Sequence, residues 1–276
     1  MLLTVLLGLT AAACWGIPDV WLAQATRNVG PFTVVFGSVL IGVAFIAPAA
    51  LFVGTPDWTL RGVLLAVFVG ALTAAGYQAG FVAFQKGSVS IVAPIIACEG
   101  GVAAAIALAA GEHLRRSILA LLGLAVVGVV LAAMGESAGA SGALPAALAA
   151  CIWGLILYLS APVAEDLGVY WGLLVIRLSA LGWMLPIALR SGAALRWRGD
   201  PWRVAAWGLG DAMAYLAYVA AADRGPLAVA SVLAAQFATV AVIVATVFFR
   251  ERLRARQWVG VALVIVAITT IAAIAG

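Results

Sequence analysis

Apolar residues run along the chain in ten continuous segments, separated by short stretches that carry charges, glycine or proline. Each segment has roughly 18–25 residues, enough to cross about 30 Å of hydrocarbon at 1.5 Å per helical residue. The apolar runs do not alternate with a period of two, which favours helices over the strands of a membrane barrel. We therefore predict an all-α integral membrane protein with ten transmembrane helices. They cover residues 2–25, 31–53, 60–84, 88–110, 117–134, 143–164, 168–189, 203–222, 226–249 and 257–275.

The composition excludes several other classes of protein. Of the 276 residues, 66% are hydrophobic and 9% are charged, against about 25% charged residues in a soluble globular domain. A soluble enzyme, a nucleic-acid-binding protein and a disordered protein are all incompatible with these values. The net charge of +4 is typical of basic cytoplasmic loops and indicates no nucleic-acid partner. We expect a multi-pass protein of the cell inner or plasma membrane.

Catalytic and metal-binding motifs are missing from the sequence. The cysteines at positions 14, 98 and 151 have no CxxC spacing, so they indicate neither a disulfide framework nor a zinc site. No phosphate-binding GxxxxGK[ST] loop is present, which disfavours ATP-driven transport. An intramembrane enzyme would need a nucleophile paired with a base, and the single histidine, His113, lies between predicted spans. We therefore expect no enzymatic activity, no cofactor and no bound metal.

The two halves of the chain resemble each other when one is shifted by about 138 residues. The matches include Trp15-Gly16 with Trp153-Gly154, Tyr77 with Tyr215, and Lys86-Gly87 with Arg224-Gly225. Each half, 1–138 and 139–276, then carries five predicted spans. Because five is odd, the second half must enter the membrane upside down relative to the first. Secondary transporters use such inverted repeats to open a midplane site alternately to either side.

A further duplicated turn makes the pattern similar to that of a known family. Gly111-Glu112-His113-Leu114-Arg115 matches Arg250-Glu251-Arg252-Leu253-Arg254 one residue later in register. With the ten spans and the paired Trp-Gly motif, the chain resembles the EamA family of the drug/metabolite transporter superfamily over nearly its whole length. The resemblance implies export or exchange of small metabolites such as amino acids, usually without ATP. It also implies a central cavity lined by the third, fourth, eighth and ninth spans.

The chain departs from that family in two respects, the arginine of the second span and the orientation of the termini that its loop charges predict. Family members carry an arginine in the second span of a half; Arg177 fits in the second half, whereas residues 36–39 of the first half contain none. The loops on the side of the termini hold four Lys and Arg, and those on the other side hold ten. This bias predicts termini outside the cell, whereas the resemblance implies cytoplasmic termini. The orientation stays open.

Charged residues inside the spans are the first candidates for a site, because an isolated charge at mid-bilayer costs about 2.5–3.5 kcal/mol. Glu99 is expected to bind an amine or exchange a proton, or else to pair with Arg177. Arg177 is expected to pair with Glu99 or Asp211, or to bind a substrate carboxylate. Asp211 fits a substrate or proton site as well as a structural pair. Asp19 is interpreted as a wetted or interfacial residue.

Deep polar and aromatic side chains extend this candidate site. Gln78 lies in the third span and Gln236 in the ninth, close to the repeat position of Glu99. Either amide fits a cavity wall or an interhelical hydrogen bond. The tyrosines are interpreted as cavity-facing or as plain packing: Tyr77 in the third span, Tyr215 and Tyr218 in the eighth.

These patterns together predict a secondary active transporter, an exporter or exchanger, of a small organic metabolite such as an amino acid or amine. Transport would proceed by alternating access at a midplane cavity, and any coupling ion is expected to be a proton at Glu99 or Asp211. The alternatives are a facilitative channel or uniporter and, with less support, an intramembrane enzyme. An internally duplicated chain of this size is expected to work as a monomer in the lipid bilayer.

Overall fold

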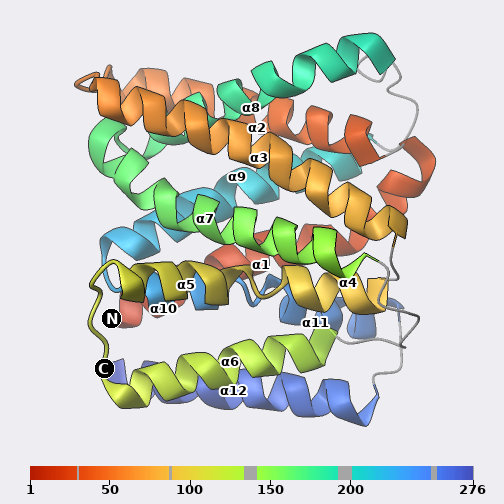
Figure 1. The fold of residues 1–276 in the computed structure, drawn as a ribbon, viewed down its shortest axis with the longest axis vertical. Coiled ribbons are helices and arrows are strands. Elements are labelled where there is room, and N and C mark those ends of the chain that lie inside the picture. Colours follow the sequence, from red (N-terminus) through yellow and green to blue (C-terminus); the bar gives the residue numbers. More distant parts are fainter. Residues whose placement is uncertain (30, 87–88, 134–141, 192–200, 250–253, 276) are drawn as a thin grey trace.

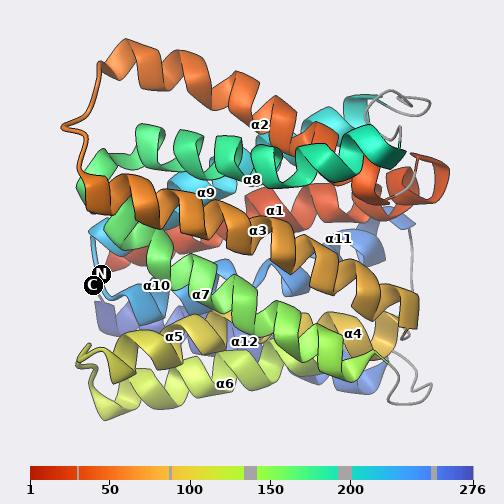
Figure 2. The ribbon, with the colours of Figure 1, turned by 45° about the horizontal axis from the view of Figure 1, so that its top comes forward.

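The computed structural model describes residues 1–29, 31–86, 89–133, 142–191, 201–249 and 254–275, and within these ranges the chain forms twelve helices and no strand. The helices run back and forth across a single bundle, with both termini at the same end (Figures 1 and 2). Their bounds are α1 Leu2–Val29, α2 Pro31–Val53, α3 Leu60–Lys86, α4 Val89–Ile96, α5 Glu99–Ala109, α6 Arg116–Ala133, α7 Ala143–Leu167, α8 Val169–Ser191, α9 Pro201–Asp223, α10 Leu227–Ala234, α11 Phe237–Phe249 and α12 Ala255–Ala275.

Helices are the expected elements here, because hydrocarbon offers no hydrogen-bond partner and each helix satisfies its backbone internally. Within the described residues, seven helical stretches are long and apolar enough to cross a membrane, counting Leu227–Phe248 as one. Large apolar side chains cover the outside of the bundle; Phe52, for example, is 92% exposed. The chain is therefore a multi-pass membrane protein, and the predicted number of ten crossings stays a prediction.

Two of the predicted spans are interrupted. The segment 88–110 forms α4 and α5, and the segment 226–249 forms α10 and α11. At the first interruption the N–H of Cys98 donates to the carbonyl of Ile95, three residues back rather than four. The N–H of Gln236 donates to the carbonyl of Leu233 in the same way. Both spans therefore turn tightly at equivalent positions of the two halves, so that new helices begin at Glu99 and Phe237.

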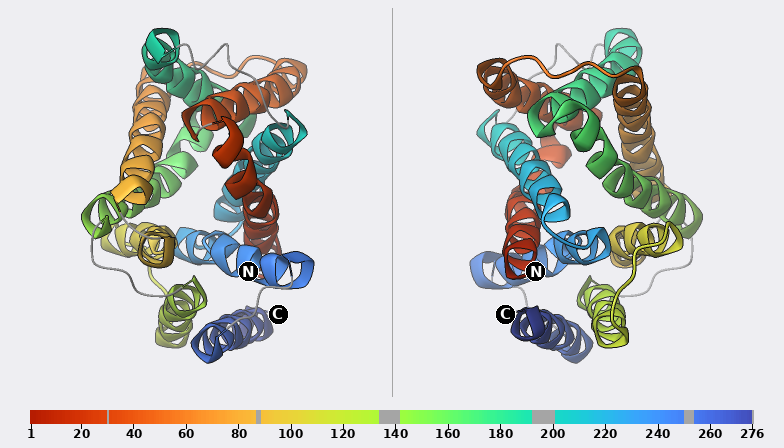
Figure 3. Two further views of the ribbon diagram at one scale, coloured as in Figure 1. Left: turned by 90° about the vertical axis from the view of Figure 1, so that its right-hand side faces the viewer. Right: turned by 90° about the vertical axis from the view of Figure 1, so that its left-hand side faces the viewer.

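The two halves of the chain are interleaved rather than packed side by side. The most extensive helix contacts join α1 to α9, α3 to α7 and α6 to α12, in each case one helix from either half. Further inter-half contacts join α2 to α8 and α5 to α10. The pair α6–α12 lies at one edge of the bundle (Figure 3). The predicted boundary at 138/139 falls among residues 134–141, outside the described part of the chain.

Candidate functional site

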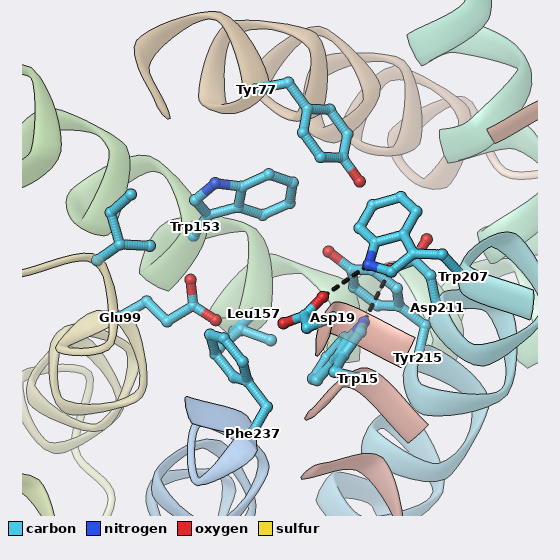
Figure 4. Close-up of a pocket in the computed structure, with 11 residues that line it drawn as sticks. Trp15, Asp19, Tyr77, Glu99, Trp153, Leu157, Trp207, Asp211, Tyr215 and Phe237 are labelled. Carbon is cyan, nitrogen blue, oxygen red and sulfur yellow. Dashed lines mark hydrogen bonds between the residues drawn. The ribbon is translucent and has the colours of Figure 1, made fainter. Parts of the chain in front are cut away.

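A cavity of about 130 Å³ lies inside the bundle, where the two interrupted spans meet the first helix of each half (Figure 4). It is smaller than the 300–1,000 Å³ typical of sites for drug-sized ligands, so only a small solute fits. The lining residues are Trp15, Asp19, Tyr77, Ile96, Glu99, Trp153, Leu157, Trp207, Asp211, Tyr215 and Phe237.

Two carboxylates face one another across this cavity, those of Glu99 and Asp19 (Figure 4). Glu99 is the first residue of α5 and is 8% exposed; among the described residues its side chain has no hydrogen-bond or ion-pair partner. Asp19 accepts a hydrogen bond from Nε1 of Trp207 at 2.7 Å. Asp19 is half-buried in α1, which continues to Val29, and it lines the cavity, in agreement with a wetted carboxylate.

The third carboxylate of the cavity, Asp211, is held by donors on both oxygens. Nη2 of Arg177 donates to Oδ2 at 2.7 Å, and Nε1 of Trp15 donates to Oδ1 at 2.8 Å. Arg177 is 4% exposed, lies outside the cavity lining and places its guanidinium 5.7 Å from the centre of the Tyr215 ring. Of the predicted alternatives for Arg177, the structure therefore shows the pair with Asp211 and not the pair with Glu99.

Aromatic rings form most of the remaining wall. The ring of Tyr77 packs edge-to-face on Trp153, with centroids 4.8 Å apart, and the ring of Tyr215 packs the same way on Trp15 at 5.1 Å. Phe237, the first residue of α11, closes the side beside Glu99 (Figure 4). The lining therefore combines three acids and six aromatic rings with two aliphatic residues, and none of these eleven described residues is basic.

Eight of the eleven lining residues come from equivalent positions of the two halves, related by the shift of about 138 residues. Two pairs are identical: Trp15 with Trp153, and Tyr77 with Tyr215. Two other pairs differ in chemistry: Glu99 is matched by Phe237, and Asp19 by Leu157. The first half therefore supplies two acids where the second half supplies apolar groups.

The repeated Trp-Gly motif explains how these walls are brought together. A Cβ on Gly16 would lie 2.8 Å from Cβ of Val240 and would overlap the carbonyl oxygen of Phe237. A Cβ on Gly154 would lie 2.8 Å from the carbonyl oxygen of Glu99. Each glycine thus lets the first helix of one half touch the start of the interrupted helix in the other half, while the tryptophan before it lines the cavity.

Three predicted site residues lie elsewhere. Gln78 is exposed, although its neighbour Tyr77 lines the cavity. Gln236 is 2% exposed and lies in the turn between α10 and α11, where Nε2 donates to the carbonyl of Val232 at 3.0 Å. The side-chain amide thus bonds to the carbonyl of Val232, which the backbone N–H of Gln236 leaves free by bonding to Leu233 instead. Tyr218 is fully buried and bonds to the carbonyl of Leu157 at 2.7 Å.

The first copy of the duplicated turn also makes a contact between the halves. Oε2 of Glu112, which follows α5, accepts the backbone N–H of Ala228 in the first turn of α10 at 3.1 Å. The second copy lies mostly outside the described residues. Within the described ranges, no three His, Cys, Asp or Glu side chains are grouped so as to hold a metal ion.

Comparison with known proteins places this arrangement in a family. No curated protein sequence matches the chain. A solved structure described only as "Crystal structure of protein" superposes with a TM-score of 0.81 at 18% identity, over 97% of this chain and 96% of the other, and so shares its fold. The profile of the EamA-like transporter family matches residues 2–134 and again residues 140–273. With two matches that together span almost the whole sequence, the chain belongs to the EamA-like transporter family.

Proposed function

We propose that the protein is a secondary active transporter that exports or exchanges a small organic metabolite with an amino group, by alternating access at the cavity around Glu99. The observation that supports this most directly is that equivalent residues of the two halves line one cavity, next to both helix interruptions. Two interlocked repeats with a shared central site can open it first to one side and then to the other.

The proposal includes ten membrane crossings, with α4–α5 and α10–α11 each counted as one, and two five-span repeats of opposite orientation. The chain would act as a monomer in the cell inner or plasma membrane. Counterflow in proteoliposomes tests the transport mechanism. A carrier shows trans-stimulation, meaning that solute on one side accelerates uptake from the other, whereas a channel shows none.

Proton coupling is proposed at Glu99, which faces the cavity without a cationic partner among the described residues. Transport measured across roughly pH 5 to 8 is expected to depend on pH in the wild type and to lose that dependence in Glu99→Gln, because the amide cannot release a proton. Asp57→Asn, at an exposed carboxylate between α2 and α3, serves as the matched control. A Glu99→Gln variant with the wild-type pH profile would exclude this role.

A further inference from the structure

The charges of the cavity favour a cation. Its three acids are opposed by one base, Arg177, which neutralises Asp211 from outside the lining. Glu99 and Asp19 are left facing one another, and none of the other lining residues in the described part of the chain is basic. Two carboxylates in this position repel each other unless a positive charge lies between them or one carries a proton. A bound cation would remove that repulsion.

The uncharged part of the wall favours an organic cation over a metal ion. Six aromatic rings surround the two acids, and aromatic faces attract alkylated ammonium groups. The N–H groups of Trp15 and Trp207 are already donated to Asp211 and Asp19. Beside the acids, Leu157 and Phe237 offer an apolar surface (Figure 4) that suits the hydrocarbon part of an amine.

A substrate carboxylate finds no cationic receptor among the eleven lining residues. The strongest recognition of a carboxylate uses an arginine fork or another cation, and Arg177, which lies outside the lining, already holds Asp211 at 2.7 Å. A carboxylate placed beside Glu99 and Asp19 would add a third negative charge. The same cavity therefore disfavours amino acids, although both amino acids and amines have the amino group that Glu99 would bind.

We infer that the substrate is a small organic cation without a carboxylate, held between Glu99 and Asp19 inside the aromatic wall. This inference rests on the proposed transport at this cavity and narrows its substrate class. The cation charge, rather than the shape of the hydrocarbon part, then determines which solutes bind.

Three solutes that share the same 3-methylbutyl chain provide the test: isoamylamine, leucine and 4-methylpentanoate, which are a cation, a zwitterion and an anion. Tetramethylammonium is added as a second cation of different shape. Binding to the purified wild-type protein is measured by calorimetry and by the fluorescence of the cavity tryptophans. Isoamylamine or tetramethylammonium is expected to bind at least ~10-fold more tightly than leucine, since a charge-assisted contact supports a difference of that size. No binding of 4-methylpentanoate is expected.

The variants Glu99→Gln and Asp57→Asn extend the test to the proposed residue. Glu99→Gln is expected to weaken cation binding by at least ~10-fold, and Asp57→Asn to leave it unchanged. The inference is overturned if leucine binds as tightly as the amines, or if neither cation binds in the millimolar range. Measurements on the wild-type protein decide this even if Glu99→Gln fails to fold.

Counterflow with the same solutes separates the two proposals. Trans-stimulation by leucine but not by the amines would overturn the inference and leave the transporter proposal intact. Selective binding of the amines without any trans-stimulation would support the inference and contradict the transporter proposal.

Discussion

The charged side chains around the cavity are of two kinds, those paired with an opposite charge and those without such a partner among the described residues. Asp211 and Arg177 form a buried pair, 5% and 4% exposed, in which each neutralises the other. Glu99 has no such partner among the described residues and is free to meet a solute. Removing one member of a buried pair leaves an uncompensated charge, whereas removing both does not. The Asp211–Arg177 pair should therefore determine stability more than specificity.

The substitution Asp211→Asn is expected to lower the free energy of unfolding by about 3–5 kcal/mol, because it strands the guanidinium of Arg177. The double variant Arg177→Met with Asp211→Asn should recover most of this loss. Unfolding in detergent, followed by heat or denaturant, measures both. A single variant as stable as the wild type would show that Arg177 is neutralised by another group.

Tyr218 allows a second test at this scale. Its hydroxyl bonds to the carbonyl of Leu157 and lies 3.0 Å from Oγ of Ser231, away from the cavity. Tyr218→Phe is expected to cost about 1–3 kcal/mol of stability by leaving buried polar groups unsatisfied. The KM of transport should stay at the wild-type value. A changed KM with unchanged stability would indicate that Tyr218 contacts the transported solute.

The free-energy cost of placing a charged side chain in the bilayer explains which site residues the sequence can predict. Glu99 and Asp211 are identified because a charge in hydrocarbon needs a partner, a water-filled cavity or neutralisation to offset its cost. The direction of a side chain is harder to predict: Gln78 follows Tyr77, and one residue turns a helix by about 100°, so the two point to different sides. The sequence does not identify Trp15, Trp153 and Trp207 as lining residues, because tryptophan also packs in cores, although the Trp-Gly repeat marks two of them.

At the scale of elements, the interrupted spans distinguish this fold from ten plain helices. α4 contains Pro94, which has no backbone N–H to donate and can weaken a helix, whereas α10 contains no proline before the equivalent turn at Gln236. Both interruptions lie against a glycine of the other half, Gly154 at Glu99 and Gly16 at Phe237, and the second is also bridged by the bond from Gln236 to Val232. Such contacts form only after folding and leave no periodic signal in the sequence.

The bond between Glu112 and α10 is testable as a local cap. Glu112→Ala removes the acceptor for the N–H of Ala228, and loss of a helix cap costs typically about 1 kcal/mol. Hydrogen exchange should become faster in the first turn of α10, which opens more often without the cap. Exchange in α6 should be unaffected and serves as the internal control. Unchanged exchange in α10 would mean that other contacts hold its start.

At the scale of the whole molecule, the repeats seen in the sequence are not units of packing. The duplication and the ten apolar segments predicted an all-helical membrane fold, and the family match confirms the repeats. Sequence similarity between halves, however, says nothing of which helices touch. In the structure α1 packs on α9 and α3 on α7, so much of the surface of each half is covered by the other.

Expression of the halves 1–138 and 139–276 as separate chains tests this interleaving. Each half alone is expected to aggregate in detergent, because the surfaces between α1 and α9 and between α3 and α7 lose their partners. Produced together, the halves should copurify through a tag on one of them. A monodisperse single half would contradict the interleaved packing.

The paired residues of the cavity also bear on the direction of transport. The matching Trp and Tyr pairs make the aromatic part of the site nearly the same in both halves. Glu99 and Asp19 of the first half, by contrast, correspond to Phe237 and Leu157 of the second half. In the proposed alternating-access mechanism, the two access states would therefore be related in shape but unequal in electrostatic energy. Exchanging Glu99 with Phe237 would move one negative charge to the other repeat with little change in the helices. In a chain built from two similar halves, the placement of a few carboxylates can set which side the solute leaves from.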